Sequence, residues 1–180
     1  MPEIVPVRTH EEIPPEYRDT PVGRLLEYHN LGRECEPHER AEIVLGMCMD
    51  NRTDLHLPRN FAFVLRTSGA NMRHNEFRLS YAIAVGGVRH IALVAHTDCG
   101  MVNLESRHRQ FVQGMMENAG WDEERAEEHF LTYAPEFGID DEVGFVLAEA
   151  QRLNLRYPRV SVAPLLYRVE DKLLYALHAD

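Results

Sequence analysis

Short runs of apolar residues alternate along the chain with polar turns and with segments of helical period. Three of these runs, 43–49, 61–65 and 91–95, are apolar at nearly every position. A strand buried on both faces of a parallel sheet has this composition, whereas a half-exposed strand alternates apolar and polar residues. The three runs therefore predict buried strands of a parallel sheet.

Segments of helical period lie before, between and after these runs. Thr20 followed by Pro21 is a helix-start signal, and this helix is expected to end near Gly32. Residues 75–86 predict a crossover helix. Residues 102–155 predict three helices, with breaks near Gly120 and at 135–138, and the clearest of them covers 140–153.

The two ends of the chain have a different character. Residues 1–19 contain four prolines and no clear period, so we expect an extended N-terminal arm. Residues 160–177 hold two apolar runs around a Glu-Asp turn, which predicts a C-terminal hairpin at the sheet edge. Residues 1–180 are accordingly expected to form a single α/β domain, with a mainly parallel central sheet flanked by helices.

Composition and charge indicate a globular protein and argue against some classes of partner. Of 180 residues, 44% are hydrophobic and 27% charged, as in an ordinary globular domain. The formal net charge of −10 argues against a nucleic acid or an anionic membrane as the main partner. No apolar run approaches the ~18 residues of a membrane span, and the first residues lack a signal-peptide pattern, so we expect a cytoplasmic protein.

Three cysteines, an odd number with wide spacing, do not resemble the disulfide framework of a small secreted protein. Cys35 lies in a charged loop, and we interpret it as incidental. Cys48 follows the first predicted strand, and Cys99 follows the third, together with His96. Sites in open α/β sheets lie beyond the carboxyl ends of the strands. Cys48, His96 and Cys99 therefore meet at one sheet edge if the first and third predicted strands are neighbours.

Two thiolates and one imidazole favour zinc over magnesium or calcium. Three protein ligands leave one tetrahedral position open, as in a catalytic zinc site, and water there has a pKa of about 7. Two thiolates are expected to raise that pKa, which favours alkaline conditions. Taken alone, a histidine or a buried cysteine is more often a packing residue. Packing does not explain the accompanying charges of Asp50 and Arg52 at a buried strand's end.

Three motifs resemble the signatures of the β-class carbonic anhydrases, in particular those of its small, compact branch. They occur in the family's order within roughly residues 40–105, and the hairpin near 167–171 is also similar. The motifs are Cys48-Met49-Asp50-Asn51-Arg52, Arg66-Thr67-Ser68-Gly69 and His96-Thr97-Asp98-Cys99-Gly100-Met101. The resemblance implies a zinc ion on Cys48, His96 and Cys99, and a catalytic dyad of Asp50 and Arg52.

The resemblance also implies an activity. This is the reversible hydration of carbon dioxide to bicarbonate by a zinc-bound hydroxide, in a homodimer or higher homo-oligomer, because a second subunit helps to build the family's pocket. Arg52 would keep Asp50 ionised, and the carboxylate would accept a hydrogen bond from the hydroxide. Without this pair, Asp50 could turn onto the metal. A surface ion pair is the plainer alternative for the two residues.

The second motif departs from the family's pattern. Thr67 and Ser68 stand where the family usually has asparagine and alanine, whereas Arg66 and Gly69 match. Two hydroxyls near the substrate favour an oxygen-rich molecule, so we rank carbon dioxide above carbonyl sulfide and carbon disulfide. A hydrolase of those sulfur gases and a non-catalytic, zinc-stabilised oligomer are the alternatives.

Overall fold

The structure is a computed structural model that describes residues 2–178. Its six strands are β1 (Glu3–Pro6), β2 (Ile43–Cys48), β3 (Ala62–Thr67), β4 (His90–His96), β5 (Ser161–Tyr167) and β6 (Leu174–His178). They form one sheet in the order β1-β6-β5-β4-β2-β3. Strands β3, β2, β4 and β5 are parallel, whereas β6 is antiparallel to β5 and β1 is antiparallel to β6. The predicted single α/β domain with a mainly parallel sheet is confirmed.

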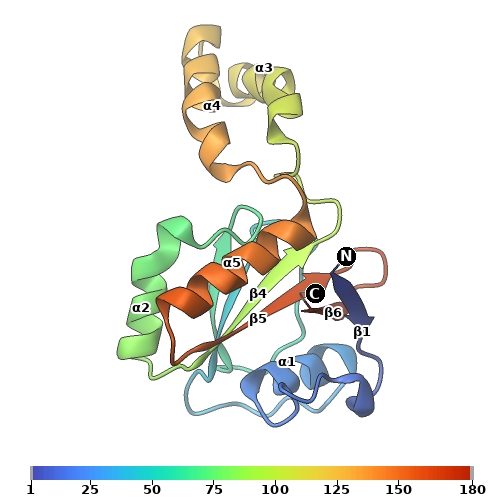
Figure 1. Cartoon of the computed structure of the whole chain (residues 1–180). Coiled ribbons are helices and arrows are strands. Elements are labelled where there is room, and N and C mark those ends of the chain that lie inside the picture. Colours follow the sequence, from blue (N-terminus) through green and yellow to red (C-terminus); the bar gives the residue numbers. More distant parts are fainter. Residues whose placement is uncertain (1, 179–180) are drawn as a thin grey trace.

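Helices cover both faces of this sheet (Figure 1). They are α1 (Pro21–Asn30), α2 (Glu76–Ala84), α3 (His108–Ala119), α4 (Glu123–Phe137) and α5 (Glu142–Arg156). Helix α1 lies on one face and α2 with α5 on the other, whereas α3 and α4 project from the sheet as a helical hairpin. Among residues 2–178, no helix has the length and apolar character needed to cross a membrane.

The core has two layers because successive residues of a strand point to opposite faces. In β2 and β4, Leu45 and Val94 pack in the layer that includes α1. Their neighbours Val44 and Leu93 pack in the layer that includes α2 and α5. All four side chains are fully buried. The central strands are therefore apolar at successive positions, as the sequence pattern predicts.

The sequence patterns predict the positions of the helices well, but they predict the edge of the sheet less well. The Thr20 hydroxyl accepts hydrogen bonds from the N–H groups of Val22 and Gly23, as expected for the cap of α1. Pro135 lies inside the last turn of α4, so the break begins only after Phe137. Strand β1 pairs with β6, and the predicted hairpin of β5 and β6 therefore lies one strand inside the sheet edge.

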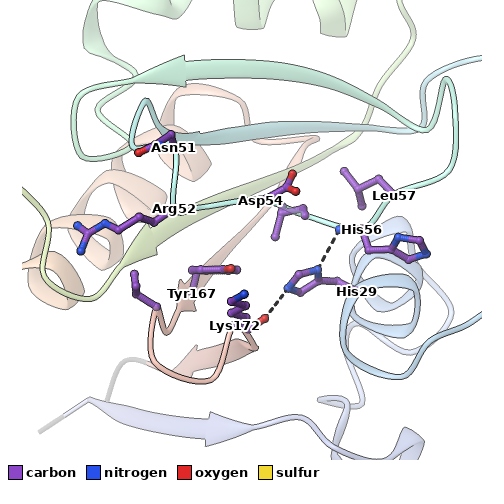
Figure 2. Close-up of a pocket in the computed structure, with 10 residues that line it drawn as sticks. His29, Asn51, Arg52, Asp54, His56, Leu57, Tyr167 and Lys172 are labelled. Carbon is purple, nitrogen blue, oxygen red and sulfur yellow. Dashed lines mark hydrogen bonds between the residues drawn. The ribbon is translucent and has the colours of Figure 1, made fainter.

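A pocket of about 640 Å³ opens at the carboxyl ends of the parallel strands (Figure 2). Arg52 and His29 of α1 are among the residues that line this pocket. The Nδ1 atom of His29 accepts the N–H of His56 at 3.0 Å, so its proton is on Nε2, which donates to the carbonyl of Lys172 at 2.9 Å. Burial lowers the pKa of His29. This histidine is thus a neutral bridge that joins α1 to two loops.

Candidate metal centre

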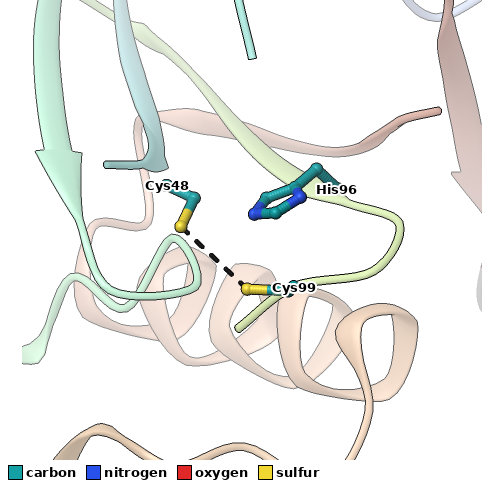
Figure 3. A group of neighbouring side chains, drawn as sticks. All are labelled: Cys48, His96 and Cys99. Atoms are coloured by element: carbon teal, nitrogen blue, oxygen red, sulfur yellow. Dashed lines mark hydrogen bonds between the residues drawn. The ribbon is translucent and has the colours of Figure 1, made fainter. Parts of the chain in front are cut away.

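Three potential ligands meet where β2 and β4 end. Cys48 is the last residue of β2 and His96 the last of β4, and these strands are hydrogen-bonded neighbours. Cys99 follows in the turn after β4. One ligating atom from each residue lies within 4.8 Å of the others, and all three residues are buried (Figure 3). The structure therefore brings together the three residues that the sequence analysis assigns to a metal.

The donor atoms fit a soft or borderline metal such as zinc. The Nδ1 atom of His96 hydrogen-bonds the carbonyl of Thr97 at 2.9 Å, which leaves Nε2 unprotonated in the neutral ring. This Nε2 is buried and has no hydrogen-bond partner among the described residues. The two Sγ atoms are 4.0 Å apart and form no disulfide. An ion bound by both sulfurs would also satisfy the isolated imidazole nitrogen.

The two thiols of this cluster share one proton when no metal is bound. The hydrogen bond between the two sulfurs, together with the N–H groups of Asp50 and Gly69, lowers the pKa of Cys48. The adjacent thiolate, and burial, raise the pKa of Cys99. Burial would lower the pKa of His96, but the nearby negative charge of Cys48 and the hydrogen bond to the Thr97 carbonyl outweigh this effect and raise the pKa.

Asp50 and Arg52 form a two-point ion pair beside the cluster. The Arg52 Nε and Nη2 atoms donate to Asp50 Oδ1 and Oδ2 at 3.0 and 2.7 Å, and the Arg52 N–H donates to Oδ1 at 2.9 Å. The guanidinium lowers the pKa of Asp50 to about 2. The Oδ2 atom lies 3.9 Å from His96 Nε2. An ionised carboxylate therefore stands next to the unpartnered nitrogen.

Arg52 also joins the two loops that carry the ligands. Its Nη1 donates to Asp98 Oδ2 at 2.8 Å, and its Nη2 donates to the Asp98 carbonyl at 2.9 Å. The sequence analysis did not assign a role to Asp98. Its place inside the His96–Cys99 motif was the available signal, but nothing in the sequence shows that Arg52 reaches it.

Arg66 holds the loop after β2 from the opposite side. Its Nη1 donates to the Cys48 carbonyl at 2.9 Å and to the Thr53 hydroxyl at 2.7 Å, and its Nη2 donates to the Thr53 carbonyl at 2.8 Å. The Thr53 hydroxyl in turn donates to the Asp50 carbonyl at 2.6 Å. One guanidinium thus fixes the backbone on both sides of Asp50.

The two residues that depart from the family motif lie in different surroundings. Thr67 is paired in register with Cys48, and its hydroxyl is buried with no partner among the described residues. Ser68 lines an apolar groove of about 410 Å³ between the helical hairpin and the sheet domain, together with Met101 and Phe137. Met101 also packs against the cluster of Cys48 and Cys99. The groove therefore adjoins the candidate metal centre.

The remaining cysteine is not part of the cluster. Cys35 Sγ lies 3.3 Å from His56 Nε2, on the loop that lines the pocket in Figure 2. It packs partly against the core layer of α1.

Comparison with protein families identifies a related group. Residues 43–149 match the family model described as "Carbonic anhydrase". This match covers more than half of the chain and includes the cysteine–histidine cluster, the Asp50–Arg52 pair and Arg66. No curated protein sequence matches the chain.

Solved structures share the fold. The carbonic anhydrase from Glaciozyma antarctica is 20% identical, with a TM-score of 0.58, and the alignment covers 90% of this chain and 98% of the other. The carbonic anhydrase from Streptococcus mutans is 17% identical, with a TM-score of 0.60 and coverage of 82% and 89%. The apo form of a carbon disulfide hydrolase is 20% identical, with a TM-score of 0.53 and coverage of 88% and 89%. At these identities the likeness is one of fold.

The sulfur pair generates a testable pH dependence. Because these hydrogen bonds lower the pKa of Cys48, one cysteine per chain should stay ionised in the metal-free protein at pH values below the ordinary titration range of a thiol. The ultraviolet absorption of the thiolate measures this. Cys48→Ser should remove the signal, and the control Cys35→Ser should leave it. A wild-type thiolate that is protonated in the ordinary range, near pH 8–9, would contradict the shared-proton arrangement.

Proposed function

The chain belongs to the β-carbonic anhydrase family, and on that basis we propose that it is a zinc enzyme that reversibly hydrates carbon dioxide to bicarbonate. Cys48, His96 and Cys99 would hold the metal. The observation that carries this proposal is the buried, unpartnered Nε2 of His96 facing two cysteine sulfurs. Such an arrangement has no evident packing role, because an unsatisfied buried nitrogen costs free energy unless an ion or water occupies the site.

The protein's own groups suit this reaction. Zinc, when bound, would act as a Lewis acid that makes water a nucleophile at near-neutral pH. Asp50 is ionised and can accept a hydrogen bond from the reacting water. The two-point hydrogen bonding by Arg52 keeps the carboxylate charged and orients it. The same contact would restrain Asp50 from turning toward the metal. Asp50 and Arg52 are therefore the proposed catalytic residues.

A second candidate activity is the hydrolysis of carbon disulfide or carbonyl sulfide. The observation that favours it is the apolar groove lined by Met101 and Phe137, since a sulfur-containing gas gains little from polar groups. The carbon disulfide hydrolase above has the same fold. The family model that matches residues 43–149 is that of the carbonic anhydrases, and this match favours carbon dioxide. We therefore keep carbon dioxide as the first candidate.

Activity on all three gases tests the proposal. Purified protein should contain about one zinc per chain by elemental analysis. It should hydrate carbon dioxide in stopped-flow measurements at mildly alkaline pH, faster than it releases sulfide from either sulfur gas. Cys99→Ala should lose most of the zinc and the activity, whereas Cys35→Ala should keep both.

Each other outcome has a defined meaning. Fast sulfide release without carbon dioxide hydration would replace the first candidate by the second. A zinc-loaded protein that is inactive on all three gases would favour a non-catalytic, zinc-stabilised oligomer. Folded wild-type protein that binds no zinc would reject the metal site itself.

The dyad predicts a non-additive effect on turnover. Asp50→Asn and Arg52→Met should each lower kcat by about 100-fold, because each removes the oriented carboxylate from the reaction. The double variant should be little worse than either single variant, since the two residues act as a unit. The exposed residues Glu39 and Arg40 provide a control: Glu39→Gln and Arg40→Met should leave kcat unchanged. If the fold-loss in kcat of the double variant equalled the product of the two single losses, Asp50 and Arg52 would act separately.

A homodimer is part of the proposal. Strand β3 is an edge strand, with no strand of residues 2–178 on its outer side, and Phe63 and Val64 on it are exposed. Helix α2 exposes two large side chains, Phe77 and Tyr81, and Val85 at its C-terminal cap is exposed as well. A second copy of the chain offers the same edge strand and the same apolar side chains, so the two edges can pair about a two-fold axis.

Sedimentation tests this interface. The wild type should be a dimer or a larger even-numbered oligomer at micromolar concentration. A charge at the edge, Val64→Asp, should shift the equilibrium toward monomer, because pairing would bury the new carboxylate. Leu155→Asp is the matched control, since Leu155 is also exposed but lies on α5. A wild-type monomer, or equal effects of both variants, would contradict the β3 interface.

A further inference from the structure

A single peptide bond next to a ligand is held at both of its polar atoms. The carbonyl of Asp98 accepts a hydrogen bond from Arg52 Nη2 at 2.9 Å. The N–H of Cys99, on the same peptide, donates to Glu142 Oε1 at 3.1 Å. Neither group belongs to a strand or a helix, so these two side chains determine how this peptide is oriented.

The peptide needs such support because of its backbone conformation. Asp98 has a φ angle of 56°, in the left-handed region that residues other than glycine seldom adopt. An uncommon backbone conformation persists when its surroundings over-determine it. The orientation of this peptide directs the Cys99 side chain toward Cys48, where the sulfurs are 4.0 Å apart.

Glu142 is placed by the fold and not by the loop that it contacts. It is the first residue of α5, whose cap Asp141 accepts the N–H of Gly144. Backbone hydrogen bonds join the segment before α5 to the segment after Cys99. The Ile139 N–H donates to the Met101 carbonyl at 3.0 Å, and its carbonyl accepts the Asn103 N–H at 3.2 Å. Contacts within the protein chain therefore hold the carboxylate beside the Cys99 amide.

We propose that Glu142 is a positioning residue for the metal ligand Cys99. It holds the Cys99 amide, and with it the left-handed Asp98–Cys99 peptide, so that the sulfur faces Cys48 and His96 in the metal-free protein. The inference rests on the proposed function in one respect, that Cys99 binds the metal. An acidic residue at a helix start also stabilises the helix electrostatically, but that effect does not require a hydrogen bond to Cys99.

Two conservative variants separate these roles. Glu142→Gln keeps the reach of the side chain and an acceptor oxygen but loses the charge. Glu142→Asp keeps the charge but is one methylene too short. The proposal predicts that Glu142→Gln binds zinc within about 3-fold of the wild type in a chelator competition, whereas Glu142→Asp binds at least about 10-fold more weakly. Measuring the thermal unfolding of each metal-free variant confirms that it is folded.

A second measurement needs no metal. Isotope labelling of cysteine gives three backbone amide signals, one for each cysteine. In the metal-free protein, Glu142→Asp should shift the Cys99 amide signal and speed its hydrogen exchange, and Glu142→Gln should change it little. The Cys35 and Cys48 signals should not move. This readout reports the hydrogen bond even if the wild type binds no zinc, so a failure of the proposed metal site and a failure of this inference are distinguishable.

Helix α4 supplies the matched control. It begins with the same pair of residues, because its cap Asp122 precedes Glu123, which is exposed. Glu123→Gln and Glu123→Asp should change neither zinc affinity nor any cysteine amide. Weaker zinc binding in Glu142→Gln but not in Glu142→Asp would show that charge, and not the hydrogen bond, is responsible, and would overturn the proposal. An unchanged Cys99 amide in Glu142→Asp would overturn it as well.

Discussion

The parallel pairing of β2 with β4 is the contact on which the candidate metal centre depends. Met47 lies opposite Val94, so the two strands end within one residue of each other and place Cys48 and His96 at the same edge of the sheet. Helices cover both faces of these strands, and hydrophobic burial therefore maintains the pairing. A shift of one residue in either strand would turn its ligand to the opposite face. The geometry of the ligands is thus a consequence of core packing.

Beyond the strand ends, hydrogen bonds from arginine side chains, and not backbone pairing between strands, hold the loops in place. Arg66 binds carbonyl groups on the loop after β2, and Arg52 joins this loop to the turn after β4. A planar guanidinium with five donors suits this task, because loop carbonyls leave the sheet in several directions. Arg52 is shared between the carboxylates of Asp50 and Asp98. The position of the proposed catalytic carboxylate therefore depends on both ligand-bearing loops.

The candidate site lies between two surfaces of different character. On one side, the pocket at Arg52 also contains Lys172 and Asp54 (Figure 2). On the other side, the groove at Met101 is lined mainly by apolar and aromatic side chains. An apolar gas and an anion are solvated in opposite ways, because burial favours the first and disfavours an unpaired form of the second. The proposed reaction converts an apolar gas into an anion, and both surfaces suit this proposal.

Much of the fold and of the candidate site was predictable from local sequence. Two of the three continuous apolar runs correctly predicted the buried strands β2 and β4, whereas the run 61–65 lies in the edge strand β3 and is partly exposed. Thr20 and Pro21 determined the start of α1, and the short motifs after the strands singled out Cys48, His96 and Cys99. Only the tertiary structure decided that β1 covers the C-terminal hairpin, that Arg52 reaches Asp98 46 residues away, and that Glu142 reaches the amide of Cys99. The physical reason is that periodicity and capping act within a few residues of the chain, whereas these contacts depend on which strands pair and how the helices pack on them.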